Sequence, residues 1–210
     1  MFNLIWGYLL IITILFSANI GLFLGNIKLN GKDSILISIV LGILFLVVIN
    51  ISTFISFDLL AYFSYIFILI AVLIFIILIL YLKNDDSKNP MIISVILFYA
   101  SSFILASQIN ESFIFDSLLF TVISIIIMII AFQSSKLLKF AKRPYNVIVG
   151  EYMSLEGILI FLFGLTFLST ITLDYTMFSS FLILTPTYQL IYVIIGIVFV
   201  LIIGFYWYDK

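Results

Sequence analysis

"LLAYFSYIFILIAVLIFIILILYL", Leu59 to Leu82, is a stretch without a single charged side chain. A helix rises about 1.5 Å per residue, so about 20 apolar residues span the roughly 30 Å hydrocarbon core of a bilayer. Similar runs recur along the whole chain, whereas a transmembrane barrel shows short alternating segments. The sequence therefore predicts an all-α, polytopic integral membrane protein.

The composition supports the same fold class. The chain has 210 residues, of which 65% are hydrophobic and 9% are charged, and its mean hydropathy is +1.40. A soluble domain carries roughly 25% charged residues, so the charges available here are too few to cover a water-exposed surface. We expect one multi-pass transmembrane domain, residues 1–210, in a cell membrane or an organelle's inner membrane, with the lipid bilayer as a partner.

Seven apolar runs have the length of a membrane-spanning helix. They are Leu4–Leu24, Ser34–Ile55, Leu59–Leu82, Met91–Ser107, Phe113–Phe132, Val147–Ile171 and Tyr188–Trp207. With seven crossings, the loops after the first, third and fifth runs share one side with the C-terminal tail, and these segments hold all nine Lys and Arg residues. Because basic loops stay on the cytoplasmic side, we predict that the N-terminus is outside and the C-terminus inside.

Four of the basic residues gather in the loop before the sixth run. They are Lys136, Lys139, Lys142 and Arg143. This inner-face basic loop is either a docking face for peripheral partner subunits or only the topology signal together with a contact to anionic lipid. The sequence leaves both interpretations open.

Two residue types are missing from the chain, namely cysteine and histidine. Without cysteine there is no disulfide, iron–sulfur cluster or thiolate zinc site, and without histidine there is no imidazole base or haem ligand. We therefore expect no cofactor, no metal site and no catalytic residue in this chain. A nucleic-acid partner is not expected either.

Glu156 is the most conspicuous polar residue of the chain. It lies within "NVIVGEYMSLEGILIFLFGL", Asn146 to Leu165, about 15 Å along a helix that begins after Asn146. A charged side chain near the bilayer centre costs about 2.5–3.5 kcal/mol on insertion scales, and burial disfavours the charged form. Glu156 is therefore predicted either to carry a proton or sodium ion or to bond a neighbouring helix as a neutral carboxyl.

Other polar groups have supporting places in this hypothesis. Glu151 lies about 140° around the helix from Glu156, so we expect it at the entrance of an ion path, paired with Lys142 or Arg143. Asn50 and Ser102 are predicted to support the path if they face Glu156. Gly21 and Gly25 form a G-x-x-x-G pattern, which lets another helix approach closely.

The segment "YMSLEGILIFLFGL" resembles the glutamate-bearing helix of the NuoK-type subunit of respiratory complex I. In that family, the glutamate belongs to a polar axis that runs through the membrane arm. The resemblance implies a three-helix unit over residues 113–207. The whole chain is similar in length and layout to the HyfE-type subunit of energy-converting hydrogenases, in which a basic stretch, here "SSKLLKFAKRPYN", precedes the glutamate helix.

This resemblance implies a non-catalytic membrane subunit of a proton- or sodium-translocating oxidoreductase, with other membrane and peripheral subunits as partners. NuoK-type units carry a second carboxylate in the following helix, and the run Tyr188–Trp207 has none. Two alternatives remain open at this stage. One is a stand-alone small transporter of the LysE exporter type, and the other is a structural anchor subunit of another membrane complex.

Overall fold

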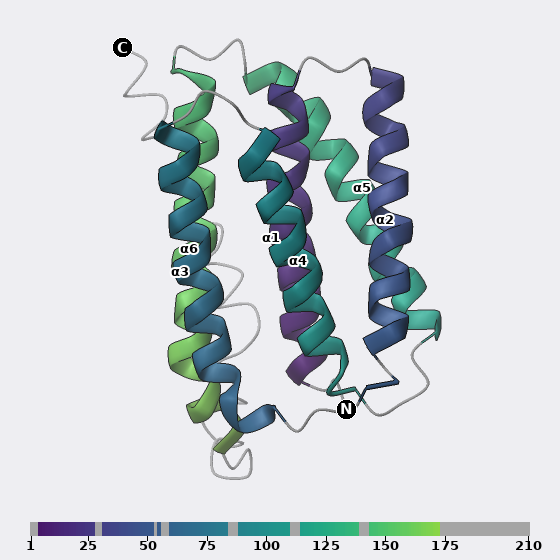
Figure 1. Ribbon diagram of the computed structural model, residues 1–210, viewed down its shortest axis with the longest axis vertical. Coiled ribbons are helices and arrows are strands. Elements are labelled where there is room, and N and C mark those ends of the chain that lie inside the picture. Colours follow the sequence, from purple (N-terminus) through teal and green to yellow (C-terminus); the bar gives the residue numbers. More distant parts are fainter. Residues whose placement is uncertain are drawn as a thin grey trace, which may run out of the picture. The chain divides into compact units, whose positions relative to one another are not determined.

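The computed structural model describes residues 4–27, 31–52, 54–55, 59–83, 88–109, 114–138 and 143–172, all helical apart from short connections (Figure 1). The helices are α1 (Leu4–Asn26), α2 (Gly31–Ser52), α3 (Phe63–Lys83), α4 (Lys88–Ala106), α5 (Ile114–Leu138) and α6 (Tyr145–Thr172). A short 3-10 turn, η1 (Leu60–Tyr62), leads into α3. Six candidate transmembrane helices in the described residues make this chain a multi-pass integral membrane protein.

The structure confirms six of the seven predicted spans and changes some of their ends. The largest change is in α5, which continues beyond the predicted end at Phe132 to Leu138. The apolar run marks the part of a helix inside hydrocarbon, whereas backbone hydrogen bonding continues through the interface, where Lys136 near the C-terminal end complements the helix dipole. The seventh span, Tyr188–Trp207, lies outside the described residues, so the seven-helix count and the unit 113–207 stay predictions.

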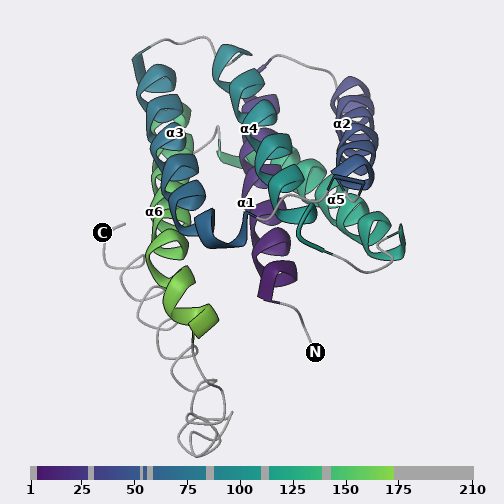
Figure 2. The same ribbon diagram turned by 60° about the horizontal axis from the view of Figure 1, so that its bottom comes forward.

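The chain divides into two units after Leu168, and the first unit, Met1–Leu168, contains the helices up to that residue. Within it, α1 lies between the pair α3 and α6 on one side and the pair α2 and α5 on the other, with α4 alongside (Figures 1 and 2). In the most apolar part of α1, 67% of the residues are buried, against 28% in α2. The first helix is therefore the core of this unit, and α2 lies at its periphery.

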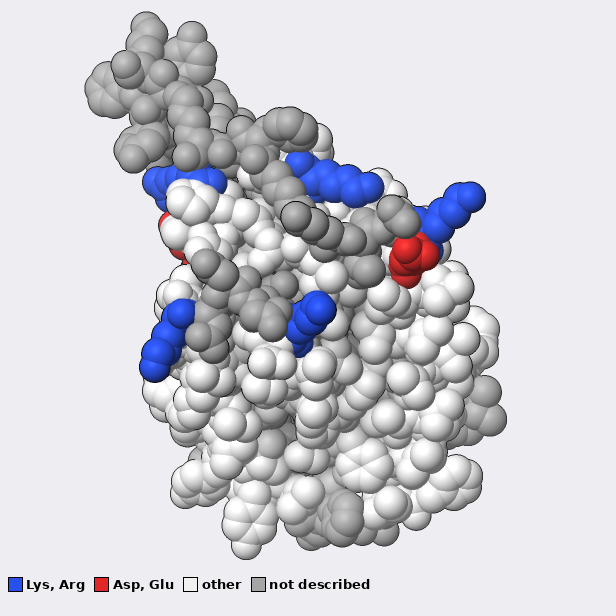
Figure 3. Space-filling view, turned by 45° about the horizontal axis from the view of Figure 1, so that its top comes forward, with Lys and Arg blue, Asp and Glu red and all other residues white. Residues whose placement is uncertain are grey.

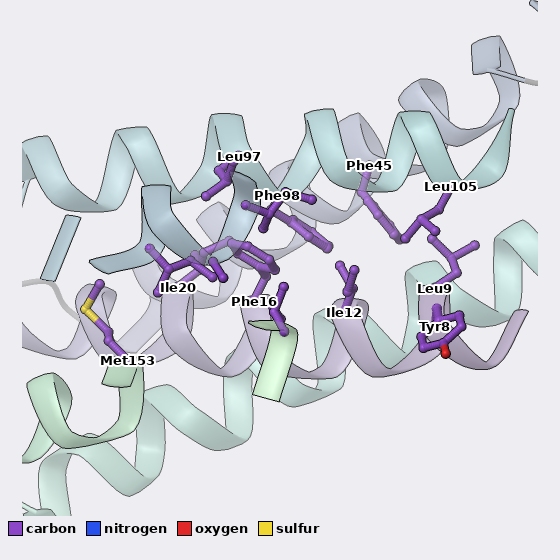
Figure 4. Close-up of a cluster of buried hydrophobic side chains, with 14 of the residues drawn as sticks. Tyr8, Leu9, Ile12, Phe16, Ile20, Phe45, Leu97, Phe98, Leu105 and Met153 are labelled. Atoms are coloured by element: carbon purple, nitrogen blue, oxygen red, sulfur yellow. The ribbon is translucent and has the colours of Figure 1, made fainter. Parts of the chain in front are cut away.

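Aromatic rings fill the centre where α1, α2 and α4 meet. Phe98 of α4 stacks on Phe45 of α2 with ring centroids 4.6 Å apart and on Phe16 of α1 at 5.8 Å. All three side chains are fully buried, and Figure 4 shows them within one apolar cluster. Stacked aromatic pairs add about 0.5–1.5 kcal/mol beyond the area they bury, so this cluster fixes how the three helices meet.

Glycines let α6 approach α3 along its length. These glycines of α6 lie seven residues apart, and their neighbours in α3 have falling residue numbers. Gly150 lies next to Leu82, Gly157 next to Phe75 and Gly164 next to Ser64. The Ser64 hydroxyl also donates a hydrogen bond to the Gly164 carbonyl oxygen. A seven-residue repeat keeps one face of a helix against its partner, so α3 and α6 form a closely packed antiparallel pair.

The predicted sidedness can be measured with single cysteines, because the chain has no native cysteine to react. Ala61 in η1 and Asn89 in α4 are both exposed. Ala61 lies just before α3, and Asn89 lies just after the loop that follows α3. We expect a membrane-impermeant maleimide to label Ala61→Cys in intact cells, and Asn89→Cys only after the membrane is opened. Labelling of Asn89→Cys in intact cells would contradict the predicted topology.

Candidate functional site

Glu156 is buried at the contact between α6 and α1. It is the middle residue of the 23-residue span Tyr145–Phe167, about 16 Å from either end. Its side chain is 1% exposed, as is that of Asn19 in α1, and Asn19 Nδ2 donates a hydrogen bond of 2.7 Å to Glu156 Oε2. The two residues form a carboxyl–amide pair that closes a contact between helices far apart in the sequence.

Two tyrosines of α6, both before Glu156 in the sequence, donate hydrogen bonds to backbone carbonyls of α1 that lie on either side of Asn19. Tyr152, one turn before Glu156, donates to the Leu15 carbonyl oxygen at 2.9 Å, and Tyr145 donates to the Leu22 carbonyl oxygen at 2.6 Å. Phenol groups on an otherwise apolar helix need such acceptors when they are buried. The three hydrogen bonds therefore fix the position of α6 along α1, and with it the position of Glu156.

Two oxygens of the carboxyl–amide pair lack a hydrogen-bond donor. Glu156 Oε1 and Asn19 Oδ1 are both buried, and no group in the described part of the chain binds either of them. An ionised carboxylate only accepts hydrogen bonds, whereas a protonated carboxyl also donates one. A proton on Glu156 would thus add the kind of group that the pair lacks, and a small cation bound by the two oxygens would serve the same purpose.

The other predicted acidic residue lies in a different environment. Glu151 pairs with Arg143 through an Oε1–Nη1 distance of 3.1 Å, and both side chains are 56% exposed. This confirms Arg143 as a partner of Glu151. The other predicted partner, Lys142, lies outside the described residues, as does Lys139. Lys136 is exposed on α5, with Nζ 4.9 Å from the centre of the Phe132 ring.

The predicted supporting residues have other surroundings. Asn50 donates to the Leu46 carbonyl oxygen at 2.8 Å and to the Ser117 hydroxyl at 3.2 Å, so it joins α2 to α5. The Ser102 hydroxyl is buried in α4 and has no hydrogen-bond partner within the described ranges. Neither of these described contacts involves Asn19 or Glu156.

The sequence interpretation missed Asn19, the residue that binds Glu156. The signal was present, because an amide within the apolar run Leu4–Leu24 needs a partner in hydrocarbon. Ser17, two residues before it, bonds in another direction: its hydroxyl lies 2.7 Å from that of Ser124 in α5. Ser17 and Asn19 therefore bond to two different neighbouring helices, α5 and α6.

The exposed ion pair is expected to contribute little to stability. Pairs in solvent are worth about 0.2–1 kcal/mol in measured cases, and Arg143–Glu151 is exposed on both sides. We expect Glu151→Gln to change the free energy of unfolding by less than about 1 kcal/mol, as measured by denaturant titration of the purified protein. A larger loss would show that Glu151 has a structural role that the exposed pair does not explain.

The fold and the buried pair define a multi-pass helical membrane protein with a carboxyl–amide contact at mid-span between α1 and α6. No family model, no curated protein and no solved structure matches the chain.

Proposed function

We propose that this chain is a non-catalytic membrane subunit of an ion-translocating complex, in which Glu156 binds and releases a proton or a sodium ion. The observation that supports this proposal best is the buried carboxyl–amide pair at the centre of α6. Two of its oxygens, Glu156 Oε1 and Asn19 Oδ1, are acceptors that no donor reaches among the described residues. A proton or a small cation is what such a pair lacks.

The position of the pair also favours ion handling. Ionisable residues within membrane spans are costly and mark ion pathways or proton relays more often than other positions do. A protonated Glu156 avoids the cost of a buried charge, and loss of its proton leaves a carboxylate that the Asn19 amide stabilises through the existing bond. Both states therefore have a partner in the same geometry, which a group that exchanges protons requires.

The continuation of the ion path is proposed to involve neighbouring subunits. Asn19 faces α6 and Ser17 faces α5, so the described polar contacts of α1 do not form one line across the membrane. Hydroxyls, water or a carboxylate from another chain would have to complete the path. This need supports a subunit of a larger assembly over a stand-alone carrier.

The proposed kind of complex rests on the resemblance of "YMSLEGILIFLFGL" to the glutamate helix of the NuoK and HyfE families. An energy-converting hydrogenase or a relative of complex I would supply the redox reaction through peripheral subunits. Those subunits would dock on the basic inner face, to which Lys136 and Arg143 belong. The chain itself would supply the membrane part of the ion path.

A structural anchor is the second candidate, and a specific observation favours it. The bonds of Asn19, Tyr145 and Tyr152 hold α6 against α1, and a neutral Glu156 could serve this purpose alone. Interhelical hydrogen bonds in membranes average about 0.6 kcal/mol. Such bonds are enough to orient a helix without any ion movement.

Purification under native conditions tests the subunit assignment. We expect the tagged full-length chain, extracted in a mild detergent, to migrate within a large assembly whose other members include redox subunits identified by mass spectrometry. The variant Glu156→Gln should co-purify with the same partners, because it keeps the shape and hydrogen-bonding capacity of the side chain. A chain that runs alone and transports a solute by itself in liposomes would overturn the assignment.

A further inference from the structure

A groove lies between the beginning of α2 and the end of α5, apart from the contact between α1 and α6. Its volume is about 1010 Å³, and its lining combines charged and apolar residues. Lys32 and Lys136 supply two positive charges and Asp33 one negative charge, while the exposed side chains of Ile130 and Leu137 supply apolar surface. The groove therefore carries a net positive charge next to a surface suited to hydrocarbon.

One of these lysines, Lys136, lies close to the beginning of α2. Lys136 Nζ lies 3.8 Å from where a side-chain carbon on Gly31 would be, at the first residue of α2. The N-terminus of a helix carries about half a positive charge, and its first N–H groups have no partner within the helix. The ammonium group of Lys136 and this helix end carry charge of the same sign, so an anion bound between them would be attracted by both.

The position of the groove in the bundle points to the chemistry of the anion. The Lys and Arg side chains on the visible face gather toward one end of the molecule, and the rest of that face is largely uncharged (Figure 3). Headgroups of lipid lie at this boundary between charged and apolar surface, and basic pockets between transmembrane helices bind lipid phosphates. Helix N-termini are themselves phosphate sites.

We propose that this groove binds the headgroup of an anionic phospholipid of the phosphatidylglycerol type. The phosphate would lie between Lys32, Lys136 and the first N–H groups of α2, and one acyl chain would lie against Ile130 and Leu137. The lining charges leave one net positive charge, which matches the single negative charge of a phosphodiester. Bound there, the lipid bridges α2 and α5 at their charged ends.

This site is independent of the proposed ion path, and its test uses lipid binding alone. The purified full-length chain is titrated in detergent with phosphatidylglycerol or with phosphatidylcholine of the same acyl chains, and bound lipid is counted by native mass spectrometry. We expect a saturable phosphatidylglycerol adduct and a binding constant for phosphatidylcholine at least fivefold weaker, since one interfacial charge contributes about 1 kcal/mol. Equal binding of both lipids would overturn the proposal.

Charge variants test the location of the site. Lys32→Gln and Lys136→Gln are each expected to weaken phosphatidylglycerol binding about fivefold, and Asp33→Asn to strengthen it. Lys83→Gln, which removes an equal charge at the end of α3, is the matched control and should leave the binding constant unchanged. If Lys83→Gln weakens binding as much as the groove variants do, the lipid recognises the overall charge of this face, and the proposed site is wrong.

Discussion

Replacing Glu156 by Gln is expected to stop ion movement through this chain while leaving its fold and its assembly intact. Gln presents a carbonyl oxygen to Asn19 Nδ2, so the 2.7 Å hydrogen bond keeps its acceptor. Its amide N–H groups resemble the protonated carboxyl, because they add a donor to a pair in which Asn19 Oδ1 has no donor among the described residues. The variant is therefore a permanent copy of the neutral state that cannot release a proton.

The expected loss is large because it removes the exchangeable group itself. Positioned proton-transfer groups contribute about 10²–10⁴-fold to the rates they serve, so we expect ion pumping coupled to the redox reaction to fall at least about a hundredfold. Pumping is measured as acidification or sodium uptake in vesicles that contain the assembled complex, with the redox rate recorded in parallel. Glu151→Gln, on the same helix but exposed, should retain most of the pumping.

Glu156→Ala separates the ion-binding role from the structural one. It leaves Asn19 Nδ2 without its acceptor and opens a cavity at mid-span, and an unpaired buried polar group costs about 1–3 kcal/mol. We expect this variant to unfold more easily than Glu156→Gln in a denaturant titration. If Glu156→Gln pumps normally while Glu156→Ala fails to assemble, Glu156 is a structural contact and the proposed ion path is wrong.

The sequence alone predicted the burial of Glu156 but not its partner. A carboxyl in the middle of an apolar run has a high cost wherever the run packs, so its burial followed from local composition. Asn19 lies 137 residues away in the chain, and its partner depends on which faces of α1 and α6 meet. That choice is made by packing, and the seven-residue spacing of Gly150, Gly157 and Gly164 was a missed cue only to the face of α6 that meets α3.

The same distinction applies to the helices. Continuous apolar runs predicted six spans correctly, because the hydrocarbon thickness fixes their length. The helix ends were predicted less accurately. In the interface both helices and loops are polar, so the sequence did not show that α5 continues to Leu138. The surroundings of Asn50 also depend on packing, and its bond to Ser117, which joins α2 to α5, did not follow from the sequence.

A large loss of stability is also expected when the first glycine of the G-x-x-x-G pattern in α1, Gly21, is replaced by Ala. A methyl group on Gly21 would lie 2.6 Å from the Met128 carbonyl oxygen and 2.7 Å from Ala131 Cβ, both in α5. Since one of these atoms belongs to the backbone, the contact cannot be relieved by turning a side chain. We expect Gly21→Ala to lower the free energy of unfolding by about 1–3 kcal/mol, the usual cost of overpacking.

Gly7 of the same helix is the matched control. A methyl group at this position would meet no neighbouring atom within 4 Å in the described part of the chain, its own helix backbone aside. We therefore expect Gly7→Ala to raise the free energy of unfolding or to change it by less than about 1 kcal/mol. Both variants gain the same helix propensity, and their difference in a denaturant titration therefore isolates the contact between α1 and α5. Equal stability of the two variants would show that α1 and α5 do not pack through Gly21.

Because α1 also carries Asn19, a Gly21→Ala variant that remains folded should shift the carboxyl–amide pair and reduce pumping as well.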